Sequence, residues 1–144
     1  MNISTKGRYG LRLMVELGLN YGGGHLPTKQ ISKKQNISEK YLEQIIGILS
    51  KAGLIKTKRG ASGGHALSKE PENYTIGEIL RVLEGSLTPV QCVEDAAFCD
   101  NTISCVTYSV WKKLDEAIKD VVDNITLKEL VDKAQNKDFY ACNI

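Results

Sequence analysis

The segment PTKQISKKQNISEKYLEQIIGILSKAGLIKTKRGASGGHAL, residues 27–67, decides the fold of this chain of 144 residues. Thr28 is placed to cap a short helix that stops before a turn at residues 35–37. Ser38 is a good cap for the next helix, over about residues 38–52, whose apolar residues recur at spacings of three and four. Two helices joined by a tight turn predict a helix-turn-helix.

A strand-like alternation and a glycine-rich tip follow the second of these helices. Apolar and polar residues alternate over residues 54–58 as in a strand, and residues 59–64 (RGASGG) indicate a basic hairpin tip. Residues 65–67 are then expected to form the second strand of the hairpin. The segment therefore predicts a winged helix-turn-helix, which makes the protein mostly α-helical with a small β-hairpin wing. An ordinary surface hairpin is the alternative.

The charge is unevenly divided along the chain. The formal net charge is only +2, yet residues 1–69 hold 12 Lys and Arg against 3 Glu, whereas residues 70–144 hold 7 against 14 acidic residues. A basic surface gains affinity for phosphates by releasing condensed counterions. The first half is therefore predicted to bind double-stranded DNA, in preference to being a merely solvated basic face.

The second helix of a helix-turn-helix turns its N-terminal part toward base edges in the major groove. Gln44 is the best candidate for reading adenine, and Glu43 for accepting from cytosine or repelling a phosphate. Lys40 is expected to hold phosphate, and Arg59 to enter a narrow minor groove. The predicted DNA-contacting residues are Lys6, Arg8, Thr28, Ser38, Lys40, Tyr41, Glu43, Gln44, Arg59, Gly60, Ser62, Gly63 and Gly64.

Helices are predicted on both sides of this segment. Apolar spacing indicates a first helix over about residues 5–21, and a capping pattern at residues 75–78 opens another. A longer helix over about residues 104–123, for which Ser104 is a candidate cap, is followed by a short one that begins at Thr126. The longer helix has one broad apolar face: Val110, Leu114, Ala117, Ile118, Val121 and Val122.

That apolar face predicts a homodimer, because a protein this small has little surface of its own to cover it. Packing within one chain is the alternative. The expected division is a winged helix-turn-helix DNA-binding domain at residues 1–85, a cysteine-containing sensor loop at residues 86–105, and a dimerisation helix with a C-terminal helix and tail at residues 106–144.

Three of the four cysteines lie between the basic half and the longer helix. Cys92, Cys99 and Cys105 are separated by six and then five residues. Thiolates on one loop can enclose zinc, copper(I) or an iron–sulfur cluster. Zinc knuckles use tighter pairs, so the spacing favours a cluster without excluding zinc, and free thiols are the further alternative. Cys142 stays an unexplained thiol.

Other classes of protein are less favoured. No signal peptide and no membrane span are evident, so we expect a cytoplasmic protein without membrane association, whose cysteines are thiols or metal ligands. The chain has no Cys-x-x-Cys pair, no nucleotide-binding fingerprint and only two histidines, which argues against a redox enzyme. The basic half argues against a module that binds only proteins.

Several motifs, in order along nearly the whole chain, resemble those of the Rrf-two-type regulators. They are residues 4–9 (STKGRY), 41–44 (YLEQ), 59–64 (RGxxGG), 82–85 (VLEG) and the cysteine triad. The resemblance implies a homodimeric winged-helix transcription factor, a repressor, and not an enzyme. It also implies that an iron–sulfur cluster of two or four irons, absent from any apo form, modulates DNA binding and is held by Cys92, Cys99 and Cys105.

Two positions depart from the members that carry a cluster. IscR-like regulators have a histidine ligand three residues after the third cysteine, where this chain has Tyr108. NsrR-like regulators recruit an acidic residue of the partner subunit at the position that matches Arg8. The fourth ligand stays open among His25, His65, Cys142, a carboxylate such as Glu94 or Asp95, and an exogenous thiol.

The N-terminus and the tail at residues 138–142 look more like CymR-like members of the family, of which the best known lack the triad. That likeness implies an alternative regulator of cysteine metabolism, without a cluster, whose partner is a protein corepressor such as cysteine synthase. The cluster-bearing members imply control of genes for cluster assembly, cysteine metabolism or both.

Overall fold

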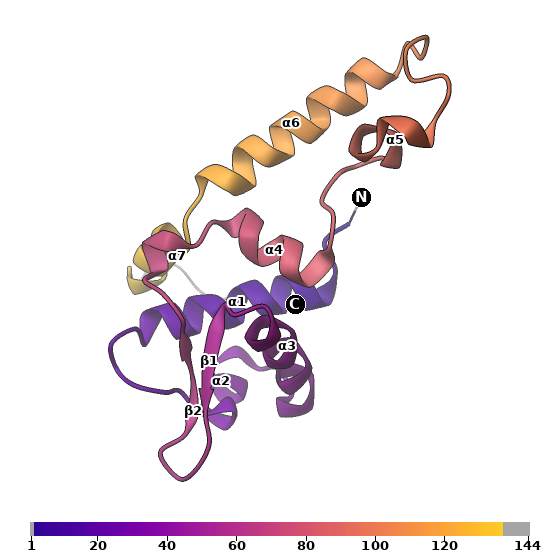
Figure 1. Cartoon of the computed structure of the whole chain (residues 1–144). Helices are drawn as coiled ribbons and strands as arrows, with labels where there is room; N and C mark the ends of the chain where they lie inside the picture. The colour runs from indigo at the N-terminus through magenta and orange to yellow at the C-terminus, as the bar shows by residue number, and fades with distance from the viewer. Residues whose placement is uncertain (1, 137–144) are drawn as a thin grey trace.

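Five helices, α1 to α4 and α7, form one body with a two-stranded hairpin, and the long helix α6 extends away from it (Figure 1). The computed structural model describes residues 2–136, so Cys142 and the tail at residues 138–142 lie outside the described residues. The elements are α1 (Thr5–Leu19), α2 (Thr28–Gln35), α3 (Glu39–Lys51), β1 (Ile55–Lys58), β2 (Gly64–Leu67), η1 (Pro71–Asn73), α4 (Ile76–Glu84), α5 (Gln91–Glu94), η2 (Ala96–Phe98), α6 (Tyr108–Asn124) and α7 (Leu127–Gln135).

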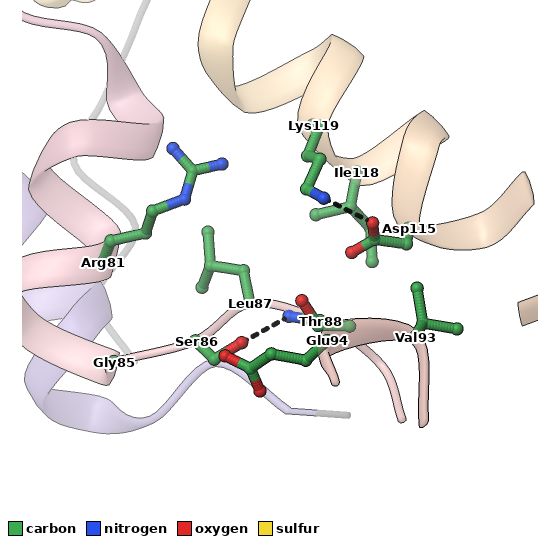
Figure 2. A pocket seen from close by; sticks show the side chains of 10 residues that line it. All are labelled: Arg81, Gly85, Ser86, Leu87, Thr88, Val93, Glu94, Asp115, Ile118 and Lys119. Carbon is green, nitrogen blue, oxygen red and sulfur yellow. Dashed lines mark hydrogen bonds and ion pairs between the residues drawn. The ribbon is translucent and has the colours of Figure 1, made fainter. Parts of the chain in front are cut away.

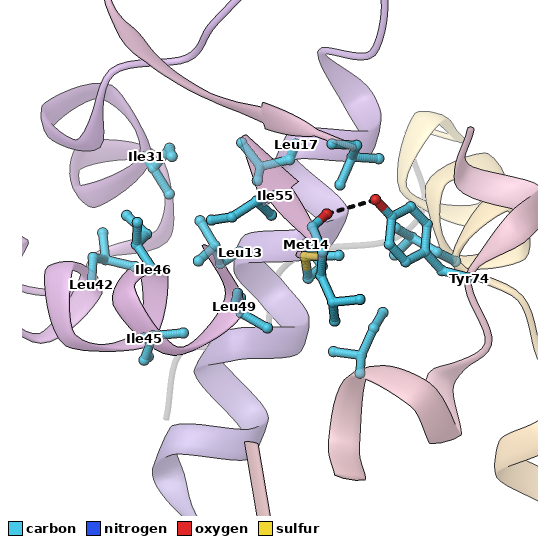
Figure 3. Packing of buried hydrophobic residues seen from close by; sticks show 14 of the residues in the cluster. Leu13, Met14, Leu17, Ile31, Leu42, Ile45, Ile46, Leu49, Ile55 and Tyr74 are labelled. Carbon is cyan, nitrogen blue, oxygen red and sulfur yellow. Dashed lines mark hydrogen bonds between the residues drawn. The ribbon is translucent and has the colours of Figure 1, made fainter. Parts of the chain in front are cut away.

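The core lies between α1, α2, α3 and the start of the hairpin (Figure 3). Its largest fully buried side chains on α1 and α3 recur at helical spacing, which places one stripe of each helix inward. Asn36, with φ of 53°, ends α2 in the left-handed conformation, and the Ser38 hydroxyl caps α3 by accepting from the Tyr41 amide. The predicted helix-turn-helix is thereby confirmed.

The hairpin pairs β1 with β2 in antiparallel register, with Ile55 opposite Leu67 and Lys58 opposite Gly64. Leu26 adds a bridge to the outer side of β2, where its amide donates to the His65 carbonyl (2.8 Å) and its carbonyl accepts from the His65 amide (2.9 Å). The wing is therefore attached to the chain just before α2, and the predicted winged fold is confirmed.

A buried tyrosine joins the hairpin to the rest of the body. The Tyr74 hydroxyl donates to the Leu54 carbonyl (2.6 Å) and accepts from the Ser68 (3.0 Å) and Lys69 (3.1 Å) amides. The Tyr74 carbonyl accepts from the Leu127 amide at 3.0 Å, which holds the start of α7 against the same point. Figure 3 shows the ring at the edge of the core.

The last two helices behave differently from each other. Helix α7 begins with the predicted capping box of Thr126 and Glu129, packs on α1, and buries Leu127 and Val131 in the core. Helix α6 packs only against α4 and α5 among its main contacts, and Asp115 is its one buried residue. The apolar face of α6 is thus left largely uncovered within this chain.

Two predicted caps are wrong. Thr28 is the first residue of α2 and makes no cap, because its hydroxyl bonds instead to His65. Ser104 does not open α6, which begins at Tyr108. The hydroxyls of Thr102 and Ser104 donate to nearby carbonyls, and such local bonds compete with a helix. The segment before them, expected to be a loop, contains the short helices α5 and η2.

Among the described residues, no helix is both long enough and apolar enough to cross a membrane. The expected division at residues 1–85, 86–105 and 106–144 stays a prediction.

Candidate nucleic-acid interface and cysteine segment

The two faces of α3 differ sharply. Leu42, Ile45 and Leu49 are fully buried, whereas Lys40, Glu43, Gln44 and Gly47 are exposed on the opposite side. Helical geometry puts these four on one face, since they are separated by three or four residues. The first turns of α3 therefore present a cation, a carboxylate and an amide to the solvent.

Tyr41 has a structural environment that its neighbours on α3 lack. It is half-buried and packs edge-on against Tyr9 of α1, with 5.7 Å between ring centroids. The Arg12 guanidinium stacks on the Tyr9 ring at 5.4 Å from its centroid and extends the same contact. The contact places the start of α1 beside the start of α3, with Lys6 half-buried and Arg8 exposed.

The wing tip is basic and open to solvent. Arg59, Gly60 and Ser62 are exposed, together with the lysines of β1. A Cβ on Gly63 would lie 2.2 Å from the Lys58 carbonyl oxygen, so the turn needs glycine there. Gly64 is buried, with φ of 151°, and a Cβ would lie 2.5 Å from the Leu26 backbone. Gly64 therefore serves the packing of the wing.

His65 fixes the wing against α2. Only 8% of it is exposed, and its Nε2 and Nδ1 lie 2.8 Å from the Thr28 hydroxyl and 2.9 Å from the Thr57 hydroxyl. Burial, reinforced by the charge of His25, lowers the pKa of His65, so the ring is neutral in the folded protein. Both ring nitrogens of His65, a candidate fourth ligand, are thus engaged in hydrogen bonds within the wing region.

A buried polar network ties α1 to α2. Gln35 donates to the Glu16 carboxylate (2.7 Å) and accepts from Arg12 Nε (2.9 Å), and Lys34 pairs with Glu16 at 3.4 Å. Glu16 and Gln35 are both 7% exposed. Sequence reasoning missed this network; the signal available was a glutamate within the apolar spacing of the first helix.

The cysteine segment lies at the other end of the molecule, between α4 and α6 (Figure 1). Cys92 on α5 and Cys99 after η2 are half-buried free thiols, and Cys105 is exposed. A hydrogen bond with the Thr107 hydroxyl, 3.2 Å from the sulfur, lowers the pKa of Cys105 and favours the thiolate that binds metals.

The three cysteines suit an iron–sulfur cluster because they are free thiols, lie in one segment and are at least partly accessible. Its arrangement is not that of a formed site, because nowhere in residues 2–136 are three His, Cys, Asp or Glu side chains gathered as metal ligands. His65 lies on β2, and His25 precedes Leu26, which pairs with that strand. Helix α5, which carries Cys92, lies at the other end of the molecule from the hairpin in Figure 1, so the two histidines are poorly placed as a fourth ligand within one chain.

The winged helix-turn-helix, with an exposed polar face on α3 and a basic wing, defines a DNA-binding transcriptional regulator. The family model described as an iron-dependent transcriptional regulator, Rrf2, matches residues 3–133. This chain belongs to the Rrf2 family, whose members are regulators and not enzymes.

Two relatives represent two branches of that family. The transcriptional regulator CymR of Bacillus subtilis (strain 168) is 44% identical over 130 residues, which are 90% of this chain and 89% of CymR. The transcriptional regulator IscR of Escherichia coli O1:K1 is 33% identical over 138 residues, which are 96% of this chain and 85% of IscR.

Solved structures agree with both relatives. The structure of CymR, the global cysteine regulator of B. subtilis, matches with a TM-score of 0.78 and 42% identity, and covers 92% of this chain and 98% of that one. IscR of T. potens matches with a TM-score of 0.77 and 40% identity, and covers 97% of this chain and 93% of that one.

The neutral state of His65 makes stability depend on pH. Because its folded pKa lies below the usual 6.5, the unfolded chain binds more protons between the two values, and stability is lost as the pH falls through that interval. We expect the free energy of unfolding, measured with urea, to fall more between about pH 7.5 and pH 5.5 in the wild type than in His65→Gln. Equal pH dependence of the two proteins would contradict the assignment.

Proposed function

We propose that this protein is a homodimeric, sequence-specific DNA-binding repressor that reads its operator with α3 and the wing. The observation that carries the proposal is the exposed face of α3, where Lys40, Glu43 and Gln44 stand over a fully buried apolar stripe. Gln44 is the proposed reader of adenine, and Lys40 holds phosphate. Arg59 extends from the wing toward the minor groove.

The remaining predicted contacts fall into two groups. Arg8, Gly60 and Ser62 are exposed and are proposed to meet the DNA backbone, with Lys6 beside them on α1. The others hold the reading surface in place and are proposed to act through packing and hydrogen bonds: Thr28, Ser38, Tyr41, Gly63 and Gly64.

The proposed dimer is supported by an apolar groove of about 750 Å³ between α4, α6 and the N-terminus. Ile3 and Leu80 line one wall, and Val121 and Val122 of α6 line the other. Val110 and Val121 are 55% and 57% exposed. They lie on the same side of α6, so the exposed apolar surface continues along the helix. A second copy of α6 is the proposed occupant, since symmetric pairing buries both faces at once.

We propose Cys92, Cys99 and Cys105 as ligands of an iron–sulfur cluster that modulates DNA binding. Three accessible thiols in one segment, one with a lowered pKa, support it. Two or four irons are both compatible with three cysteines and a further ligand. A bound cluster would hold the cysteine segment before α6 in one fixed conformation. The genes under control are proposed to serve cluster assembly, cysteine metabolism or both.

A second candidate is a cluster-free regulator of cysteine metabolism that works with a protein corepressor such as cysteine synthase. The likeness to CymR over 90% of the chain favours it, as does the scattered arrangement of the ligand-type side chains among the described residues. The two candidates share the DNA-reading surface and differ in what the cysteine segment binds.

Substitutions should separate base reading from phosphate binding. On DNA selected from a random pool, Gln44→Ala should lose about 1–3 kcal/mol of discrimination at one base pair. Arg59→Ala should weaken binding to all sequences and reduce the salt dependence of affinity. Fluorescence anisotropy measures both, with Lys112→Ala on the exposed side of α6 as control. Unchanged binding by both variants would refute the placement of the reading surface.

The dimer proposal predicts that Val121→Glu yields monomers. A symmetric interface contains two copies of Val121, one from each subunit. If each copy loses about 1.5 kcal/mol of burial energy, the dimer dissociation constant rises roughly 100-fold. Sedimentation velocity measures the change, and Lys113→Glu, an exposed position on the same helix, is the matched control. Dimers that persist in Val121→Glu would count against the groove as the interface.

Anaerobic purification decides between the two candidates for the cysteine segment. The cluster proposal predicts coloured protein with iron and sulfide in equal amounts, and a colourless variant when Cys92, Cys99 and Cys105 are all changed to Ala. Iron, sulfide and the visible spectrum are measured on both proteins. Stoichiometric zinc without iron would exclude the cluster; metal-free protein that binds DNA more tightly with cysteine synthase would support the second candidate.

A further inference from the structure

A polar cavity of about 420 Å³ lies where α4, α5 and α6 meet (Figure 2). Arg81 and Lys119 bring two positive charges to its wall, and Glu94 and Asp115 bring two negative charges. The rest of the wall consists of Gly85, the hydroxyl residues Ser86 and Thr88, and three apolar side chains, Leu87, Val93 and Ile118. Cavities of about 300–1,000 Å³ with a few convergent polar groups are typical of small-molecule sites.

Asp115 is the unusual member of this wall. It is 4% exposed, on a helix that buries nothing else. Its Oδ2 lies 2.6 Å from Lys119 Nζ, and the lysine side chain is 55% exposed. Taking a carboxylate out of water is costly, and a pair with a largely solvated lysine one turn away returns little of that cost. The charge of Arg81 also acts on Asp115, but both cations are more than a third exposed, so together they offset only part of the cost of burying the carboxylate.

The ion pair leaves hydrogen-bonding capacity that faces the cavity. A carboxylate has about four acceptor sites and an ammonium three donors, so Asp115 and Lys119 each retain groups for a ligand. Arg81 is held in place across the cavity because both its amino groups donate to Asp123, at 2.6 and 3.0 Å. Arg81 is thus a fixed part of the wall, and charged groups of both signs line the cavity.

We propose that this cavity binds a small zwitterion of the α-amino acid class. The ammonium of the ligand is accepted by Asp115 and Glu94, and its carboxylate takes donors from Lys119 and Ser86. The side chain lies against Leu87. Two charges of each sign disfavour a simple anion or cation, because either would leave one pair of wall charges facing its own sign.

The site adjoins the proposed dimer groove. At 100° per residue, Val121 lies about 120° around α6 from Asp115, so the groove and the cavity occupy different flanks of the helix. Four lining residues are common to the two: Ser86, Leu87, Thr88 and Ile118. A ligand in the cavity would join α4 of the DNA-reading body to α6 beside the groove proposed for the partner subunit.

Calorimetric titration of the full chain with each of the twenty protein L-amino acids tests the proposal. At least one should bind at one per chain, and ethylamine and propionate, which carry only the ammonium or only the carboxylate, should bind about tenfold more weakly or not at all. Binding by none of the twenty, or equal binding of the single-charge compounds, would overturn the proposal.

Three variants locate the site. Asp115→Asn and Lys119→Gln should each weaken binding about tenfold or more, whereas Glu116→Gln, an exposed carboxylate on the same helix, should not. Full affinity in both Asp115→Asn and Lys119→Gln would overturn the assignment. If circular dichroism shows that Asp115→Asn does not fold, the result with Lys119→Gln decides alone. DNA binding is measured on the same preparations, so failure here is distinguishable from failure of the proposed function.

Discussion

The hydrogen bonds of one buried tyrosine hold the wing and α7 to the body of the molecule. Tyr74 has no exposed surface, and burial raises the pKa of its hydroxyl, which therefore stays a donor. That hydroxyl meets the backbone just before β1 and just after β2, so both ends of the wing are held at one atom. The Tyr74 carbonyl holds α7 as well. A change in the angle of the wing would break these three hydrogen bonds and leave the buried Leu54 carbonyl without its partner.

Helix α6 is in contact with the rest of the chain mainly near its two ends, which explains why its apolar side chains are exposed. At one end Asp123 is paired with Arg81 of α4, and α7 follows immediately and enters the core. At the other end only the small helix α5 packs on it. A helix held in this way cannot rotate to bury its apolar side, so one flank stays available to another chain and the next flank encloses a polar cavity.

Much of the fold could be predicted from signals between residues close in sequence. Hydrogen bonds between residues far apart in sequence could not be predicted in this way. The stripe of α3, its Ser38 cap and the glycine-rich wing each depend on neighbouring residues, and each was predictable. Thr28 was misassigned because His65, 37 residues away, takes its hydroxyl. Asp115 gave no sign of burial, since a charged residue beside an apolar stripe is usually solvated. The spacing of the three cysteines indicated candidate metal ligands, but it could not show that their side chains are not gathered around one point in the described structure.

The start of the chain is fastened in place by a short contact between distant residues. The Glu84 carboxylate accepts from the Ser4 amide (3.1 Å) and from the Ser4 hydroxyl (2.5 Å). Ile3, immediately before this point, lines the apolar groove. Any peptide fused ahead of residue 2 therefore emerges at the rim of that groove. An affinity tag at this end would therefore lie beside the exposed apolar side chains of α4 and α6.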